Sequence, residues 1–276
     1  MHGCETKTRR LSCRPGAGSR PGRSDGRTRA FTLLEVLLVI GVISLLTTIL
    51  LPSLSRATEC GRRVICLNNL RALVIAAETY ASNYNGRYPI AYYSAYQPPV
   101  SVSCAWDFNA TKNWTSGQTD VEPGILWQGS GLGKIQQCPS FQGAANWGQD
   151  PYTGYNYNTS YIGHGAGEAI PQPASVEDVR EPQTCALFGD GQYVSGANKF
   201  MRAPWKNPGD AQFSGRYAGT QGYRHLGATN VAFCDSHAVS WTECCKETYP
   251  SDARKIAPGT GFLSPDNSLY DLRGDE

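Results

Sequence analysis

The sequence predicts an α+β protein in which one long N-terminal helix precedes a region of strands and loops. Residues 31–51 are almost entirely apolar, and about 20 such residues suffice for a helix to cross a bilayer. From residue 52 to about 83, apolar residues recur at intervals of three and four, as in a helix with one buried face. The rest is rich in Gly, Pro and Tyr, which favours strands and loops. We therefore expect one long helix followed by a head that contains an antiparallel sheet.

The apolar run contains one charged residue, Glu35. A carboxylate costs roughly 3 kcal/mol at the bilayer midplane and less near the end of a span. A cleavable secretory signal would have a shorter apolar region, of about 7–15 residues, ending in small residues. This run is longer and is followed by Pro52. An ordinary signal anchor explains every feature except Glu35.

Formal charge is unevenly distributed along the chain. Residues 1–30 contain eight Arg or Lys and two acidic residues, a net charge of +6, whereas the rest contains 17 basic and 21 acidic residues, a net charge of −4. A basic flank before an apolar span predicts that the flank stays in the cytoplasm and that the following segment crosses the membrane. Because the flank has no aromatic residue, we expect no nucleic-acid partner.

The string AFTLLE, residues 30–35, resembles the processing site of type IV prepilins and type II secretion pseudopilins. In that family a prepilin peptidase cuts before a Phe on the cytoplasmic side, the new amino group is methylated, and the fifth mature residue is acidic. The resemblance implies cleavage between Ala30 and Phe31, N-methylation of Phe31 and a role in assembly for Glu35. Pro52 stands where the family often has a helix-bending proline. The chain departs from the family in Ala30, where Gly is usual, and in its long leader.

The resemblance also gives Glu35 a physical role. Cleavage would place a positively charged amine on Phe31 at the membrane. Glu35 would pair with the amine of a neighbouring subunit as helices bundle, so that two charges that are costly apart in lipid become acceptable together. That pairing would set the axial register of a filament.

A type IV pilin-like architecture is implied, with a long spine helix and a globular head built on an antiparallel β-sheet. The expected segments are a cleaved basic leader (1–30), the transmembrane part of the spine helix (31–51), its amphipathic continuation (52–85) and an exported head (86–276). We expect a non-enzymatic structural subunit of a type II secretion pseudopilus or a type IV pilus-like filament. It would be single-pass in the inner membrane, with the leader cytoplasmic and the head periplasmic or extracellular. Its expected partners are prepilin peptidase, other pilin or pseudopilin subunits, inner-membrane lipid and secretion-platform proteins.

Periodicity assigns faces to the helix and places the strands. The expected buried stripe is Val64, Leu67, Leu70, Val74, Ala77 and Ala81, and the opposite face carries Arg56, Glu59, Arg62, Arg63, Asn69 and Glu78. Expected strands cover residues 91–95, 124–127, 154–162 and 184–189, and residues 230–235 and 237–241 read as a hairpin. The many Tyr and Trp residues between 90 and 165 are expected to fill a small core.

A second motif, RHLGATNVAFCDSHAV, spans residues 224–239. It resembles a C-terminal signature, His followed ten residues later by Asp and usually Gly, found with pilin-type leaders in planctomycetes and verrucomicrobia. His225 and Asp235 match the signature, His237 is the His that commonly follows, and Ser236 replaces the Gly. Residues 66–89, 138–140 and 153–163 resemble segments of the same group.

Two interpretations of this motif stay open. His225, Asp235 and His237 offer ligands suited to zinc, manganese or iron, and Asp190 or His164 could join them. Calcium would need oxygens from Asp190, Asp235 and Asn230. The alternative, which we favour, is a hydrogen-bonded clamp that needs no cofactor, in which Asp235 fixes the hairpin turn and His225 bonds to backbone.

Eight cysteines follow the apolar run, at positions 60, 66, 104, 138, 185, 234, 244 and 245. An even set in an exported domain predicts at least one disulfide. No Cys-x-x-Cys pair occurs, which gives a zinc ribbon little support. The alternative functions are a membrane-anchored glycan-binding head and a metal-dependent hydrolase that uses His225, Asp235 and His237.

Overall fold

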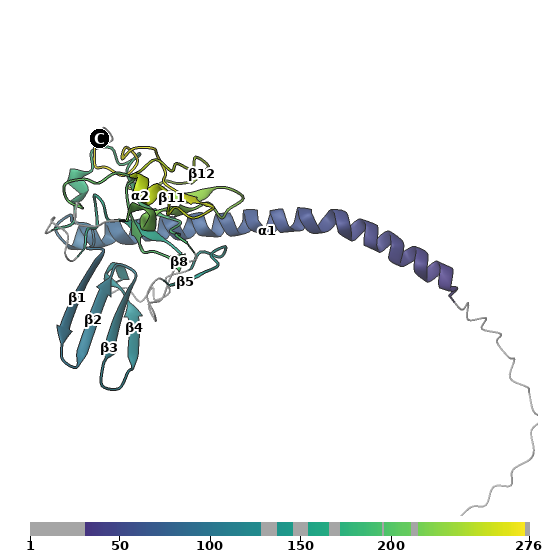
Figure 1. Cartoon of the computed structure of the whole chain (residues 1–276), viewed down its shortest axis with the longest axis horizontal. Helices are drawn as coiled ribbons and strands as arrows, with labels where there is room; N and C mark the ends of the chain where they lie inside the picture. Colours follow the sequence, from purple (N-terminus) through teal and green to yellow (C-terminus); the bar gives the residue numbers. More distant parts are fainter. Residues whose placement is uncertain are drawn as a thin grey trace, which may run out of the picture. The chain divides into compact units, whose positions relative to one another are not determined.

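A computed structural model of the chain describes residues 31–127, 137–145, 154–165, 172–194, 196–210 and 215–273. The chain divides into two units, Met1–Ile49 and Leu50–Glu276. Helix α1, Leu33–Asn83, has 51 residues and contains Pro52 (Figure 1). The expected long N-terminal helix is therefore confirmed, and Pro52 does not end it. Together with the antiparallel sheets of the second unit, it gives an α+β protein.

One antiparallel sheet has four strands in chain order (Figure 1). Its strands are β1 (Tyr92–Gln97), β2 (Val100–Ala105), β3 (Phe108–Asn113) and β4 (Thr119–Pro123). The sequence indicated only the first of them, since β2 and β3 mix Ser, Thr, Asn and Lys with few large apolar residues. Pairing with neighbouring strands, rather than local propensity, determines these elements.

A second sheet has five strands in the order β12-β11-β7-β6-β9. Its strands are β6 (Asn156–Asn158), β7 (Ala186–Gly189), β9 (Phe200–Met201), β11 (Thr229–Phe233) and β12 (Ala238–Trp241). All neighbours are antiparallel except β6 and β9. The expected hairpin is confirmed as β11 and β12, and the expected strand over residues 184–189 is confirmed as β7.

The remaining elements are short. They are η1 (Ile125–Trp127), β5 (Ala144–Ala145), η2 (Val176–Asp178), β8 (Gly196–Ala197), η3 (Arg216–Gly219), β10 (Gln221–Gly222), α2 (Pro250–Ala253) and β13 (Thr260–Gly261). The strand expected over residues 124–127 is wrong, because this segment folds as the 3₁₀ helix η1. The strand expected over 154–162 is confirmed only for β6, because the chain then turns and the Gly163 N–H bonds to the Asn158 carbonyl.

The buried face of α1 differs from the expected stripe. Val64 is 55% exposed, whereas Cys66 and Leu73 are buried. The buried set is Cys66, Leu70, Leu73, Val74, Ala77 and Ala81. It joins a core that also contains Trp106, Tyr157 and Phe188, with the last two rings stacked at 4.9 Å. Cys66 therefore belongs to the inner face of the helix.

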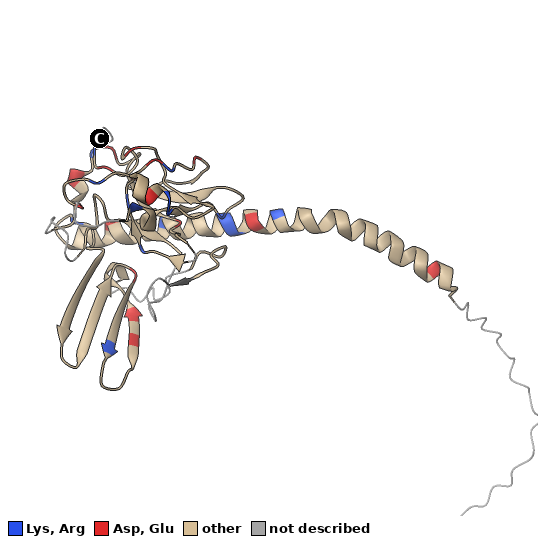
Figure 2. Ribbon diagram, viewed as in Figure 1, with Lys and Arg blue, Asp and Glu red and all other residues tan. Residues whose placement is uncertain are grey.

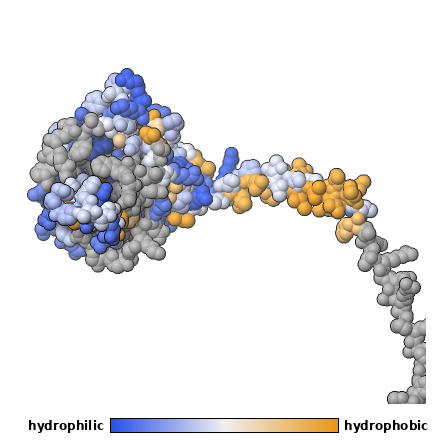
Figure 3. Space-filling model, turned by 60° about the horizontal axis from the view of Figure 1, so that its bottom comes forward, coloured by the Kyte–Doolittle hydropathy of each residue, from blue (hydrophilic) through white to orange (hydrophobic). Residues whose placement is uncertain are grey.

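The apolar side chains in the first half of α1 are exposed. Every large apolar side chain from Phe31 to Leu54 is exposed, and Figure 3 shows orange, hydrophobic residues gathered along this part of the helix with paler residues between them. Glu35 is the only charged residue from Leu33 to Ser55 (Figure 2). The helix is long and apolar enough to cross a membrane, which fits a single-pass membrane protein.

Candidate functional site

Glu35 caps the start of α1. The Thr32 N–H donates to Glu35 Oε2 at 2.8 Å, and the Glu35 N–H donates to Thr32 Oγ1 at 3.2 Å. This reciprocal pair is a capping box, which satisfies two of the N–H groups that a helix start leaves unpaired. Glu35 therefore has a local role within one chain. Of the other expected processing residues, Phe31 is exposed and precedes the helix, and Ala30 lies outside the described residues.

Asp235 and His237 lie at the turn between β11 and β12. The Asp235 carboxylate accepts from the His237 N–H at 3.1 Å and pairs with its Nδ1. Both side chains are about a third or more exposed, and the His237 ring stacks on Phe233. Asp235 thus fixes the turn, as the hydrogen-bonded clamp predicted.

Ser236 occupies the position where the signature usually has Gly. Its φ of 71° lies in the left-handed region, which Gly adopts without the steric cost that other residues bear. The Ser236 hydroxyl donates to Glu78 Oε1 of α1 at 2.8 Å. This bond from the turn to the helix offsets part of the cost of keeping Ser in that conformation.

His225 does not join Asp235 and His237. Its side chain is fully buried and faces two acidic residues, with Nδ1 at 2.8 Å from Glu59 Oε1 and Nε2 at 3.2 Å from Asp190 Oδ2. The alternative metal set of His225, Asp235 and His237 is therefore wrong, and the favoured clamp is wrong in expecting His225 to bond to backbone through its ring. A tight turn joins His225 to Ala228, and the full length of strand β11 then separates the His225 ring from the turn at Asp235.

Two buried thiols complete the surroundings of His225. Cys138 Sγ lies 3.5 Å from His225 Nε2, and Cys66 Sγ lies 3.0 Å from Asp190 Oδ1. One ligand atom from each of four buried side chains lies within 4.8 Å of every other. We call this set the Cys–Asp–His cluster; its members are Cys66, Cys138, Asp190 and His225.

Four separate segments supply the Cys–Asp–His cluster. Cys66 comes from the inner face of α1, and Glu59, seven residues earlier, lies on the same face two turns away. Asp190 follows directly on β7, where a side chain at Gly191 would place its Cβ 2.8 Å from the Asn198 carbonyl. The backbone is therefore tightly packed beside the carboxylate.

Arg224 and hydrogen bonds hold the cluster in place. Arg224 Nη2 lies 2.8 Å from Asp190 Oδ1, and its Nε donates to Cys138 Sγ at 3.3 Å. The Asn230 N–H donates to Asp190 Oδ2 at 2.8 Å. Ser140 donates to Glu59 Oε1 at 2.6 Å, which fixes the acid that faces His225. Each cluster side chain thus has a set orientation.

The charges of the cluster depend on one another. A hydrogen bond from Cys66 lowers the pKa of Cys138 to about 5. His225 and Arg224 act in the same direction, and together these groups outweigh burial, which alone would raise that pKa. Burial acts to lower the pKa of His225, but Asp190 and Cys138 outweigh it and raise that pKa to about 10. Burial also opposes ionisation of Asp190, yet Arg224 and His225 hold its pKa below the usual range. Burial raises the pKa of Cys66.

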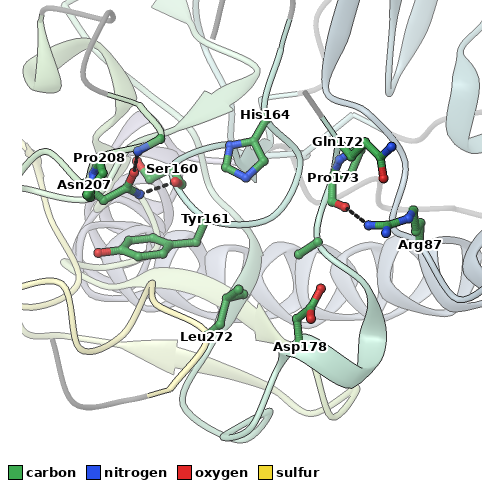
Figure 4. Close-up of a pocket in the computed structure, with 12 residues that line it drawn as sticks. Arg87, Ser160, Tyr161, His164, Gln172, Pro173, Asp178, Asn207, Pro208 and Leu272 are labelled. Carbon is green, nitrogen blue, oxygen red and sulfur yellow. Dashed lines mark hydrogen bonds between the residues drawn. The ribbon is translucent and has the colours of Figure 1, made fainter. Parts of the chain in front are cut away.

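His164 lies elsewhere, in a pocket of about 360 Å³. Figure 4 shows its ring between Ser160 and Asn207 on one side and Gln172 and Arg87 on the other. It therefore does not join His225, whereas Asp190, the other residue considered as an additional ligand, does.

Sequence reasoning found two members of the cluster and missed both thiols. His225 stood out through its motif, and Asp190 through its place after an expected strand. Cys138 lies 87 residues from His225, and Cys66 lies 124 residues from Asp190. No short spacing links them, and only the seven-residue interval from Glu59 to Cys66 could have marked one helix face.

The expected disulfide is wrong for this structure, in which the eight cysteines that follow the apolar run are free thiols. Their sulfurs contact other groups, for example Cys66 at Asp190 Oδ1 and Cys245 at Glu243 Oε1. The expected aromatic core is confirmed for Trp106, Tyr155 and Tyr157, which are buried. Tyr93, Tyr96 and Trp114 are exposed. Trp147 and Tyr152 lie outside the described residues.

Comparison with protein-family models, with curated proteins and with solved structures gave no match to this chain.

Proposed function

We propose that this chain is a type IV pilin-like structural subunit, most similar to a type II secretion pseudopilin. It sits in the inner membrane through residues 31–51, with residues 1–30 cytoplasmic and the head periplasmic or extracellular. The observation that carries the proposal is the single acid, Glu35, at the start of an uncovered apolar helix and five residues into the chain that begins at Phe31.

The apolar surface of α1 needs lipid or other helices around it. An exposed hydrophobic surface of this length is unfavourable in water, whereas both a bilayer and a helix bundle bury it. In the bilayer, Glu35 alone is costly, and the amine of Phe31 created by cleavage would be costly too. Pairing the two between neighbouring subunits removes both costs and fixes how far one helix is shifted along the next.

Processing is tested first. Co-expression of the full chain with a prepilin peptidase should shorten it so that it starts at Phe31, and the intact mass should include one methyl group. A peptidase with its catalytic acids replaced is the matched control and should leave residues 1–30 attached. A cut beyond Leu51, or no cut by the active peptidase, would contradict the proposal.

Assembly separates the two roles of Glu35. Glu35→Ala removes both the cap and the charge, Glu35→Gln removes the charge but keeps an acceptor, and Thr32→Ala breaks the capping box while keeping the acid. We expect all three to insert in the membrane. Sedimentable filaments should fall at least tenfold in both Glu35 variants and should persist in Thr32→Ala.

Either of two results would overturn the assembly role. Filament yield from Glu35→Ala equal to that of the unaltered chain would show that no intersubunit pair is needed. Loss of filaments in Thr32→Ala as severe as in Glu35→Ala would assign the effect to the helix cap. The proposed partners in these assemblies are other pilin or pseudopilin subunits and the secretion-platform proteins.

A further inference from the structure

We propose that the Cys–Asp–His cluster binds one zinc ion that fastens helix α1 to the head. The cluster lies entirely within the unit Leu50–Glu276, and all four of its side chains are buried. The inference does not depend on the pilin-like function, since it concerns how the head is held together.

The spacing of the donor atoms fits a tetrahedral ion. Zinc lies about 2.3 Å from sulfur and about 2.0–2.2 Å from nitrogen or oxygen, so neighbouring ligand atoms of a tetrahedron are about 3.3–3.8 Å apart. In the structure His225 Nε2 is 3.2 Å from Asp190 Oδ2 and 3.5 Å from Cys138 Sγ. All ligand atoms lie within 4.8 Å of one another. Only small movements would bring them onto one ion.

The donor types also select zinc. Two thiolates with one imidazole form a soft set that favours zinc over magnesium or calcium, which prefer oxygen ligands. Two thiolates and the Asp190 carboxylate carry three negative charges, and zinc with the adjacent Arg224 supplies three positive charges. These charges therefore sum to zero when zinc binds and the protons of both thiols and of His225 Nε2 are released. The further negative charge of Glu59 is partly exposed and lies 3.7 Å from Arg62.

Glu59 orients His225 as carboxylates do in zinc sites. With the proton of the ring on Nδ1, that atom donates to Glu59 Oε1 at 2.8 Å and leaves the lone pair of Nε2 facing the cluster. A carboxylate behind a metal-bound His fixes the tautomer and raises its basicity. Ser140 in turn donates to Glu59. Glu59 is thus a positioning residue, not a ligand.

Four protein ligands leave no open position on a tetrahedral ion. Structural zinc sites are closed in this way, whereas catalytic sites keep one position for water or substrate. The complete burial of His225 likewise denies a substrate access. The ion would instead join Cys66 of α1 to three segments of the head, which stabilises the packing of the helix.

A disulfide between Cys66 and Cys138 is the competing use of the two thiols. A disulfide would not require His225 Nε2 and Asp190 to face the same point, nor Glu59 to fix the ring. The convergence of all four donors favours zinc, and the test distinguishes the two.

The experiment uses the full chain, purified in detergent through an affinity tag that does not bind metal, from cells grown with zinc. Elemental analysis should find one zinc per chain. His225→Ala and Cys138→Ser should reduce bound zinc at least tenfold, and Glu59→Gln should weaken zinc binding by about 10–100-fold. Cys245→Ser, a buried thiol outside the cluster, and His237→Ala should retain one zinc.

Replacing zinc with cobalt(II) tests the site in the unaltered chain, so this test does not depend on whether the variants fold. In the unaltered chain, cobalt should give the strong visible bands of a tetrahedral site and thiolate charge-transfer absorption. A weak octahedral spectrum would overturn the proposal. It would equally be overturned by metal-free protein with free thiols, by a Cys66–Cys138 disulfide found by mass spectrometry, or by zinc that persists in both Cys138→Ser and His225→Ala.

Discussion

The head contains two buried ion pairs that differ in the groups around them. Arg216 and Asp210 form an ion pair with both side chains fully buried, and Arg224 and Asp190 form another that is almost as buried. Among the described residues, the hydrogen bonds of the Arg216 side chain go to oxygen: its Nε donates to the Ala203 carbonyl at 2.9 Å and its Nη2 to Ser160 Oγ at 2.8 Å. The protein itself therefore supplies the hydrogen-bond acceptors and the counter-charge of the guanidinium.

Around Asp190 the partners include the Cys66 thiol and the His225 imidazole, and the Cys138 thiol lies within 4.8 Å. Thiols are weak hydrogen-bond donors and acceptors, so they add little to the satisfaction of a buried carboxylate. They are strong zinc ligands when deprotonated. Burial of charge therefore does not by itself mark a ligand site. The kinds of donor atom and their convergence on one point do, and this separates the Cys–Asp–His cluster from the Arg216–Asp210 pair.

Breaking the Arg216 pair should have the largest effect. Arg216→Ala leaves Asp210 buried without its counter-charge, and we expect a loss of about 3–5 kcal/mol in the free energy of unfolding. Urea titration of the detergent-solubilised chain, followed by tryptophan fluorescence, measures this. Arg254→Ala, on the exposed surface, is the matched control and should change stability by less than about 0.5 kcal/mol. Equal effects of the two variants would contradict the pair's structural role.

The next largest effect should be the stabilisation by zinc, which we expect to depend on the Cys–Asp–His cluster and not on the Arg216–Asp210 pair. At free zinc 100 times the Kd, the unaltered chain should gain about 2.7 kcal/mol over the chelated chain. The chain with Cys138→Ser should gain almost nothing. Arg216→Ala, provided it still folds, should gain as much as the unaltered chain, because its pair takes no metal. The same urea titration, with and without a chelator, measures all three, and a zinc-independent midpoint in the unaltered chain would contradict the expected coupling.

Without metal, the two histidines of the motif should still differ in how much each contributes to the free energy of unfolding. His225→Ala leaves Asp190 and Glu59 short of a buried partner, which should cost about 1–3 kcal/mol. His237→Ala removes a partly exposed pair with Asp235 and should cost less than about 1 kcal/mol. Thermal melting of the chelated variants compares them, and an equal or larger cost for His237→Ala would refute this assignment.

The smallest effect concerns Ser236. In a Glu78→Ala background, where its hydroxyl has lost its acceptor, Ser236→Gly should stabilise the chain by about 1 kcal/mol, because Gly tolerates the positive φ. With Glu78 present the gain should shrink, since the substitution also removes the bond to α1. Unfolding of the four chains in this double-mutant cycle gives the difference, and identical gains in both backgrounds would mean that the bond contributes nothing.

The sequence by itself determined the elements that depend on neighbouring residues. Apolar spacing within short windows predicted α1 almost to its last residue, and alternation on either side of Asp235 predicted the hairpin of β11 and β12. The capping of α1 also depends on nearby residues only, because Thr32 and Glu35 have the three-residue spacing of a capping box. These features need only the fixed periods of a helix or a strand.

Only the tertiary structure decided which face of α1 is buried and what meets there. The spacing of apolar residues placed Val64 on the inner face, whereas packing against the head buries Cys66 there and leaves Val64 exposed. The same packing brought Cys138, Asp190 and His225 to that thiol from segments far apart in the chain. Such contacts leave no periodic trace in the sequence, because their geometry arises from how whole elements pack and not from the dihedral angles of adjacent residues.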